Sequence, residues 1–222
     1  RLDLAPSATR EAFQAKSCTV VAARLLKDAR GRAIVRERMS QLAGALAPQL
    51  TGRLLESAAP GRPGVLLARL PGVSAPEIVI LGAGTLGSTA ARQFGALGVS
   101  VHLLDNDLTK LEACSATLPV NVSAEPATRE RIAYMASFAN ALVVAVRAEK
   151  GPMPIVISED MVRAMRPGAV IVDFSIDEGG GVATSRPVAD PADAYTLHGV
   201  VHLAMPNTPS LVARTATRLL SQ

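Results

Sequence analysis

A glycine-rich turn is the part of the sequence whose residue types and spacing are best suited to chemistry. It reads GAGTLG, follows the apolar, β-branched run 78–81 and leads into a predicted helix over 86–97. Gly82 permits a tight turn out of the strand, Gly84 lets the backbone approach a pyrophosphate, and Gly87 lets the helix pack close to the sheet. The first N–H groups and the dipole of that helix favour phosphate. The pattern predicts a dinucleotide-binding turn; the alternative is a strand–helix–strand unit without a ligand.

An acid at the end of the next strand supports the first interpretation. The apolar run 99–104 closes on Asp105, about 20 residues after the glycines. A carboxylate at this place accepts hydrogen bonds from both ribose hydroxyls of a dinucleotide and repels a 2′-phosphate. The sequence therefore predicts NAD as the cofactor, in preference to NADP.

Two other strand ends carry polar residues that can act on a substrate. Asp177 and Glu178 follow the apolar run 169–174 and precede three glycines, so one carboxylate can orient a substrate or a proton-transfer group. The alternative is a solvated acidic turn. Asn207 follows the run 200–205 and can hydrogen-bond a carboxamide or a substrate group, or cap the last helix, and these two roles are compatible.

The remaining histidines and cysteines give weaker signals. His102 alternates within a strand and is expected to be structural, whereas His198 and His202 flank a strand. Cys18 and Cys114 fit no metal or redox spacing, so two reduced cysteines in a cytoplasmic protein are expected. The sequence holds no Ser-His-Asp order, no metal-ligand cluster and no Walker loop, and no metal is expected.

Composition excludes several classes of protein. The net charge is +4, but the arginines are scattered and only 3% of residues are aromatic, which argues against nucleic-acid binding. No apolar run reaches the roughly 18 residues that a membrane span needs, and no signal peptide is visible.

The elements that must position these residues alternate in type along the chain. Strands are predicted over 78–81, 99–104, 118–122, 141–146, 169–174 and 200–205. Helices are predicted over 86–97, 128–138, 158–165 and 210–220, with a short helix or loop over 108–116. This α/β alternation predicts a Rossmann fold with a doubly wound parallel sheet, whose ligands bind at the carboxyl ends of the strands.

The N-terminal part of the chain, before these alternating strands and helices, has a different sequence pattern. Residues 1–38 are predicted to be a small remnant of a second domain, with a helix over 8–16 and a strand pair over 18–26 and 33–35. Residues 39–222 are predicted to form an NAD-binding Rossmann domain. Its leading helix spans 39–56, where Pro48 is expected to kink or split it, and a Pro- and Gly-rich connection follows.

From residue 39 onward the sequence resembles the alanine dehydrogenase and NAD(P) transhydrogenase α-subunit family. The matching pieces include MSQLAGALAPQL, IVILGAGTLGSTAARQFGALGVSVHLLDND, ISEDMVRAMRPGAVIVDFSIDEGGGVATSRP and GVVHLAMPNTPSLVARTAT, in the family's order. The resemblance implies that Asp177 is the catalytic aspartate of the dehydrogenase branch and that Asn207 positions substrate or nicotinamide. Besides the three glycines, it implies cofactor contacts at Ser40, Thr85, Leu86, Asp105, Lys110, Ser123, Val146, Arg147, Arg186, Met205, Pro206 and Thr208.

The departures from the family pattern also carry information. Arg147 stands where the family has an apolar residue, and Glu178 stands in place of a glutamine. The family's substrate domain, which supplies an arginine, a lysine and a catalytic histidine, is mostly absent; in one alignment Asp3 falls on the histidine. We therefore expect a missing domain or a partner chain to complete the site.

The resemblance implies an NAD-dependent amino-acid dehydrogenase of the alanine dehydrogenase type, or its NAD-binding domain. Hydride passes between NAD and an amino acid, giving a 2-oxo acid and ammonia. The alternatives are an inactive NAD(H)-binding module and a transhydrogenase-like hydride-transfer subunit, which Asp177 disfavours because transhydrogenase subunits carry an amide there. A homo-oligomer is expected.

Overall fold

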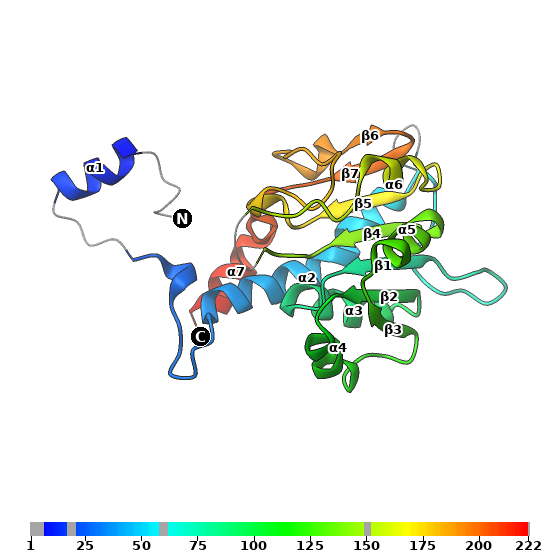
Figure 1. Ribbon diagram of the computed structural model, residues 1–222, viewed down its shortest axis with the longest axis horizontal. Coiled ribbons are helices and arrows are strands. Elements are labelled where there is room, and N and C mark those ends of the chain that lie inside the picture. The colour runs from blue at the N-terminus through cyan, green and yellow to red at the C-terminus, as the bar shows by residue number, and fades with distance from the viewer. Residues whose placement is uncertain (1–6, 17–20, 58–61, 149–151, 222) are drawn as a thin grey trace.

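A computed structural model of the chain describes residues 7–16, 21–57, 62–148 and 152–221. Its centre is a seven-stranded sheet in the order β3-β2-β1-β4-β5-β7-β6, with helices on both faces (Figure 1). The strands are β1 Glu77–Leu81, β2 Ser100–Asp105, β3 Val122–Pro126, β4 Ala141–Val144, β5 Val170–Asp173, β6 Tyr195–Leu197 and β7 Val200–Leu203. The α-helices are α1 Ser7–Ala15, α2 Ile34–Leu55, α3 Thr85–Ala96, α4 Leu108–Ser115, α5 Arg129–Phe138, α6 Glu159–Arg163 and α7 Ala213–Leu220. Short 3-10 turns are η1 Ala23–Leu25, η2 Ile176–Glu178, η3 Pro191–Asp193 and η4 Thr208–Val212.

The central strands are apolar along their whole length because both of their faces are covered. In β1, Ile78 and Ile80 belong to the core that includes residues of α2, α3 and α4, whereas Val79 and Leu81 belong to the core that includes residues of α5 and α6. All four are at most 1% exposed. This two-sided burial is typical of a parallel sheet and confirms the predicted doubly wound fold.

The strand order reverses at β1, which fixes where a ligand can enter. Leu81 pairs in parallel with Leu104 of β2 on one side and with Val144 of β4 on the other. The connections from β1 to β2 and from β3 to β4 leave in opposite directions, so a crevice opens beyond the carboxyl ends of β1 and β4.

The third strand lies several residues later than the sequence predicts. The predicted strand spans 118–122, but β3 begins at Val122, and Val120 is fully exposed. The amides of Leu118 and Val122 donate to the carbonyls of Ser115 and Pro119, so the predicted stretch is a turn. As an edge strand, β3 is only half-buried and carries polar residues that hide its periodicity.

The predicted strand pair near the N-terminus is wrong for the described residues. Residues 23–25 form a 3-10 turn, and residues 34 and 35 begin α2; residues 17–20 lie outside the described part. The turn between them does form, because the Asp28 carboxylate accepts from the amides of Arg30 and Arg32.

The leading helix also differs from its prediction. It begins at Ile34, so the predicted boundary between residues 38 and 39 falls inside α2; the division into two domains remains a prediction. Pro48 does not split it. The helix continues because its Ala- and Leu-rich side is buried, and this packing outweighs the loss at Pro48 of one backbone donor.

Strand β6, which pairs antiparallel with β7 at the sheet edge, was not predicted from the sequence. The two strands are joined by His198 and Gly199, both with positive φ (53° and 76°), which is the backbone of a two-residue hairpin turn. The last predicted helix is a 3-10 turn followed by α7. Among the described helices, none is long and apolar enough to cross a membrane.

Candidate functional site

The three glycines of the turn occupy three different environments. Gly82 has φ +103°, and a Cβ built there would lie 2.5 Å from the carbonyl oxygen of Ala145. At Gly87 a Cβ would lie 1.7 Å from the carbonyl oxygen of Gly82, so the helix packs directly on the turn. At Gly84, by contrast, φ is −65° and no atom lies within 4 Å of the Cβ position. Two glycines are therefore required by the fold, whereas Gly84 faces open space.

The N-terminus of α3 has the features of an anion-binding site. Gly84 is its N-cap, and it offers no side chain to the first N–H groups of the helix. Thr85 and Leu86 form the first helical turn beside that open space. Free N–H groups and the positive end of a twelve-residue helix are the features that bind phosphate. The residues present therefore fit a pyrophosphate.

Asp105 joins the end of β2 to the glycine turn. Its Oδ2 accepts from the amide of Ala83 at 2.6 Å, and its Oδ1 accepts from the amide of Asp107 at 2.8 Å. A carboxylate has about four acceptor positions, so these two bonds leave capacity for ribose hydroxyls. A hydrogen bond from the Thr109 hydroxyl, with the charge of Lys110, lowers the pKa of the neighbouring Asp107.

Helix α2 crosses α3 at the glycine turn. A Cβ at Gly44 would lie 2.5 Å from the carbonyl oxygen of Leu86 and 2.8 Å from Cβ of Thr89, so the two backbones touch. Ser40 is half-buried and lies one helical turn before Gly44, on the same side of α2. The crossing therefore brings Ser40 towards the N-terminal end of α3.

The two predicted catalytic residues lie together, although 30 positions separate them in the sequence. The backbone N–H of Asn207 donates to both carboxylate oxygens of Asp177, at 3.2 and 3.1 Å. Asn207 has φ +51°, and both residues are exposed. Asp177 lies in η2 beyond β5, and Asn207 follows β7, so both belong to the carboxyl edge of the sheet that also carries the glycine turn.

The two departures from the family pattern form an ion pair with each other. Nε of Arg147 lies 3.3 Å from Oε1 of Glu178, which links the end of β4 to η2. Beside this pair, the Ser175 hydroxyl donates to the carbonyl oxygen of Val146 at 2.8 Å. The sequence pattern predicted no pairing between Arg147 and Glu178.

Several other predicted residues lie further from this group. Arg186 covers the ring of Tyr195 at the sheet edge, with the guanidinium carbon 4.1 Å from the ring centroid. Ser123 lies within β3, 3.0 Å from the His102 ring, and not at a strand end. Met205 is 9% exposed and belongs to the core, whereas Pro206 is exposed. The structure thus gathers Ser40, the glycine turn, Asp105, Val146, Arg147, Asp177 and Asn207, and leaves Arg186 and Ser123 apart.

Two buried titratable residues lie in β5 and β7. Asp173, at the end of β5, is 1% exposed and accepts from the amides of Ser175 and Gly181. His202 is fully buried, and its Nε2 lies 2.8 Å from the Thr184 hydroxyl oxygen. An acid that ends an otherwise apolar strand was the available signal for Asp173.

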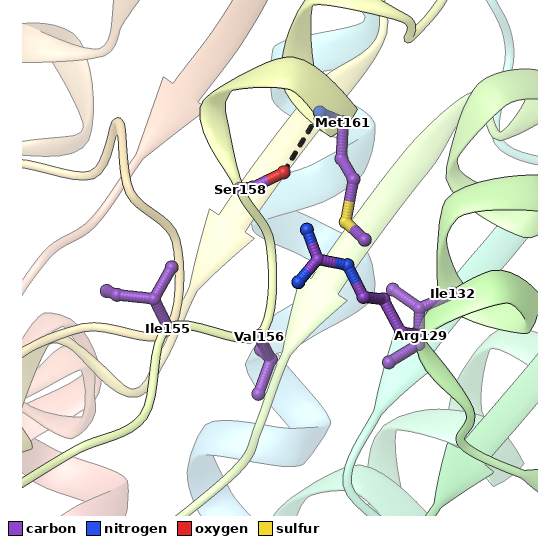
Figure 2. A pocket seen from close by; sticks show the side chains of 6 residues that line it. All are labelled: Arg129, Ile132, Ile155, Val156, Ser158 and Met161. Atoms are coloured by element: carbon purple, nitrogen blue, oxygen red, sulfur yellow. Dashed lines mark hydrogen bonds between the residues drawn. The ribbon is translucent and has the colours of Figure 1, made fainter.

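A separate cavity of about 210 Å³ lies between α5, α6 and the segment before α6. Figure 2 shows the Arg129 side chain extending towards Met161, while Ser158 caps α6 by accepting from the Met161 amide. None of the predicted site residues lines this cavity. In the described part of the chain, no three His, Cys, Asp or Glu side chains are grouped to hold a metal.

Comparison with known proteins gives consistent matches. Residues 47–222 match the family described as alanine dehydrogenase/PNT, C-terminal domain. The chain is 33% identical to an alanine dehydrogenase of Bacillus subtilis over 212 residues, which cover 95% of this chain and 56% of that protein. It is 36% identical to an alanine dehydrogenase of Methanococcus maripaludis over 184 residues, covering 82% and 49%.

Solved structures agree with these matches. An L-alanine dehydrogenase superposes with a TM-score of 0.84 at 33% identity, over 90% of this chain and 55% of that one. A transhydrogenase from Sinorhizobium meliloti has a TM-score of 0.78 at 21% identity, over 96% and 62%, and supports the fold alone. The chain spans about half the length of the curated relatives it matches.

Proposed function

Because the chain belongs to the alanine dehydrogenase/PNT family, whose C-terminal domain it matches, we propose that it binds NAD and serves an NAD-dependent amino-acid dehydrogenase. The observation that carries this proposal is the pairing of Asp177 with Asn207 at 3.1 Å, at the same sheet edge as the glycine turn. The Asp177 carboxylate is thereby fixed to the backbone of Asn207, whose side chain is a carboxamide, beside a dinucleotide crevice.

The bound NAD is proposed to lie across the strand-order reversal. Its pyrophosphate meets the N-terminus of α3 over Gly84, with Ser40 approaching from α2. The adenosine ribose meets Asp105 beyond β2, and Lys110 lies on the next helix. The nicotinamide half then extends the other way, over β4 and β5, towards Val146, Arg147 and the loop that carries Asp177. Thr85, Leu86 and Pro206 complete the proposed cofactor contacts. The resemblance also implies contacts at Arg186, which lies on the Tyr195 ring, and at Met205, which is 9% exposed, so these two belong to the proposal on the resemblance alone.

NAD, when bound, supplies the group that accepts hydride from the α-carbon of the amino acid. The chain's own contribution is positioning and proton handling. Asp177 is exposed and acceptor-only when ionised, so it can orient a proton-transfer group, while the Asn207 side chain can hold the substrate or the nicotinamide amide.

The substrate and partners follow from the same proposal. An amino acid or 2-oxo acid is the proposed substrate, and a substrate domain or a partner chain supplies the remaining groups. We also propose a cytoplasmic homo-oligomer.

The test measures NADH consumption with a panel of 2-oxo acids plus ammonia, and NADH binding in the same samples. Asp177→Asn is compared with wild type and with Asp190→Asn, which changes an exposed aspartate that caps the turn η3. The proposal expects turnover to fall at least about 100-fold in Asp177→Asn with binding retained, and to be unaffected in Asp190→Asn. NADH binding without turnover on any substrate identifies a binding module, and hydride exchange with an NADP-binding partner identifies a transhydrogenase-like subunit.

A further inference from the structure

The loop that carries Asp177 is closed at both ends by one buried carboxylate. Asp173 Oδ1 accepts from the Ser175 amide at 2.9 Å, and Oδ2 accepts from the Gly181 amide at 3.1 Å. These donors lie two and eight residues after the acid, so Asp177 sits near the middle of the segment between them. A single side chain therefore holds the start and the end of this segment together.

Gly180 of this loop packs against the same carboxylate. Gly180 has φ +84°, and a Cβ there would lie 3.3 Å from Oδ2 of Asp173. The Gly180 amide also donates to the Ser175 carbonyl at 3.0 Å, which narrows the base of the loop. The loop therefore has little freedom as long as Asp173 accepts both hydrogen bonds.

The buried charge is costly to the fold. Burial raises the pKa of the Asp173 carboxyl, against the lowering effect of its N–H donors. An ionised side chain that is 1% exposed is unfavourable unless hydrogen bonds compensate. Its bonds to the Ser175 and Gly181 amides close the loop of Asp177, and hydrogen bonding from the Ser185 side chain and the Val182 amide, beyond that loop, also lowers its pKa.

We propose that Asp173 is a positioning residue that fixes the Asp177 carboxylate by closing the 174–181 loop. This inference rests on the proposed function for the meaning of Asp177, but the geometric claim is testable without turnover. Asp177 in turn accepts from the Asn207 amide, so the effect of Asp173 reaches a strand end 34 residues away in the sequence.

The experiment uses the full chain and the isosteric variant Asp173→Asn. Its amide offers one acceptor oxygen, so one of the two loop bonds is lost. Amide hydrogen exchange is measured by NMR at Gly181, at Asn207 and at Ser88, which donates to Gly84 within α3. We expect about tenfold faster exchange at Gly181 and Asn207, no change at Ser88, and a melting midpoint within about 4 °C of wild type.

Comparing the binding of NADH and ADP-ribose distinguishes a local effect on the Asp177 loop from a general loss of cofactor binding. NADH should bind about tenfold more weakly to Asp173→Asn, whereas ADP-ribose, which lacks the nicotinamide, should bind as to wild type. Gly180→Ala crowds the same carboxylate from the loop side and should reproduce the exchange pattern if Asp173→Asn does not fold. Unchanged exchange at Asn207 in the variant that folds, or equal losses for both ligands, overturns the inference. A wild type that binds no NADH refutes the proposed function but leaves the exchange test valid.

Discussion

Replacing Gly84 with alanine should separate cofactor binding from folding. The backbone there has φ −65° and ψ −174°, which alanine adopts without strain, and no atom lies within 4 Å of the new methyl group. Reduced freedom of the unfolded chain stabilises by about 0.4–1 kcal/mol. Alanine is a poorer N-cap than glycine by a similar amount, about 0.5 kcal/mol. The free energy of unfolding should therefore change by less than about 0.5 kcal/mol.

Binding should respond very differently to the same methyl group. It occupies the space through which a pyrophosphate reaches the N–H groups of α3, and a lost hydrogen bond to a charged group costs about 1.5–3 kcal/mol. At about 1.4 kcal/mol for each factor of ten, NADH affinity should fall at least tenfold. Urea unfolding and NADH fluorescence titration on the same sample measure both quantities. NADH binding within twofold of wild type would refute the placement of the pyrophosphate over Gly84.

Three further predictions concern the same domain. Gly87→Ala should lower the free energy of unfolding by about 3 kcal/mol, because the new methyl group would lie 1.7 Å from the Gly82 carbonyl oxygen and α3 would have to move. Urea denaturation measures this loss, and a loss below about 1 kcal/mol would contradict the packing of α3 on the turn. In a double-mutant cycle, Arg147→Leu and Glu178→Gln should give a coupling free energy of about 0.5–1 kcal/mol in thermal unfolding, because the ion pair is partly exposed. If the destabilising effects of the two substitutions simply add, the ion pair contributes nothing to stability. Burial lowers the pKa of His202 from its ordinary 6.5, so below pH 6.5 the unfolded chain binds a proton that the native state does not. The contribution of His202 to the free energy of unfolding should be constant above pH 6.5 and fall below it by up to about 1.4 kcal/mol per pH unit. His202→Gln should reduce this slope in urea unfolding, and an equal slope in both proteins would show that His202 is not its origin.

The parts of the fold that were predictable are those with two-sided burial. Strands β1, β2, β4 and β5 are short apolar runs, and their type and their place along the chain followed from that pattern, whereas their order in the sheet was not predicted. The edges were not predictable in the same way. β3 is half-buried and polar, and β6 is three residues long with two exposed side chains. The continuity of α2 through Pro48 depends on tertiary packing, which no local pattern contains.

In the candidate site too, some features were predictable from the sequence and others were not. The glycine turn and Asp105 were predictable because their roles depend on backbone geometry within one βαβ unit. The contact between Asp177 and Asn207 was anticipated only as a shared sheet edge. The pairing of Arg147 with Glu178 depends on how two loops approach across the sheet, and so does the two-ended closure by Asp173.

The crossing of α2 over α3 has a mechanical consequence. Gly44 leaves no space for a side chain between the two backbones, so α2 cannot shift at this point without moving the start of α3. The 22-residue helix extends for about 33 Å, and its second half is held in the core, where Thr51, Leu54 and Leu55 are at most 2% exposed. The first turn of α3 should therefore move together with α2, so a bound phosphate is held by a part of the domain that is anchored in the core.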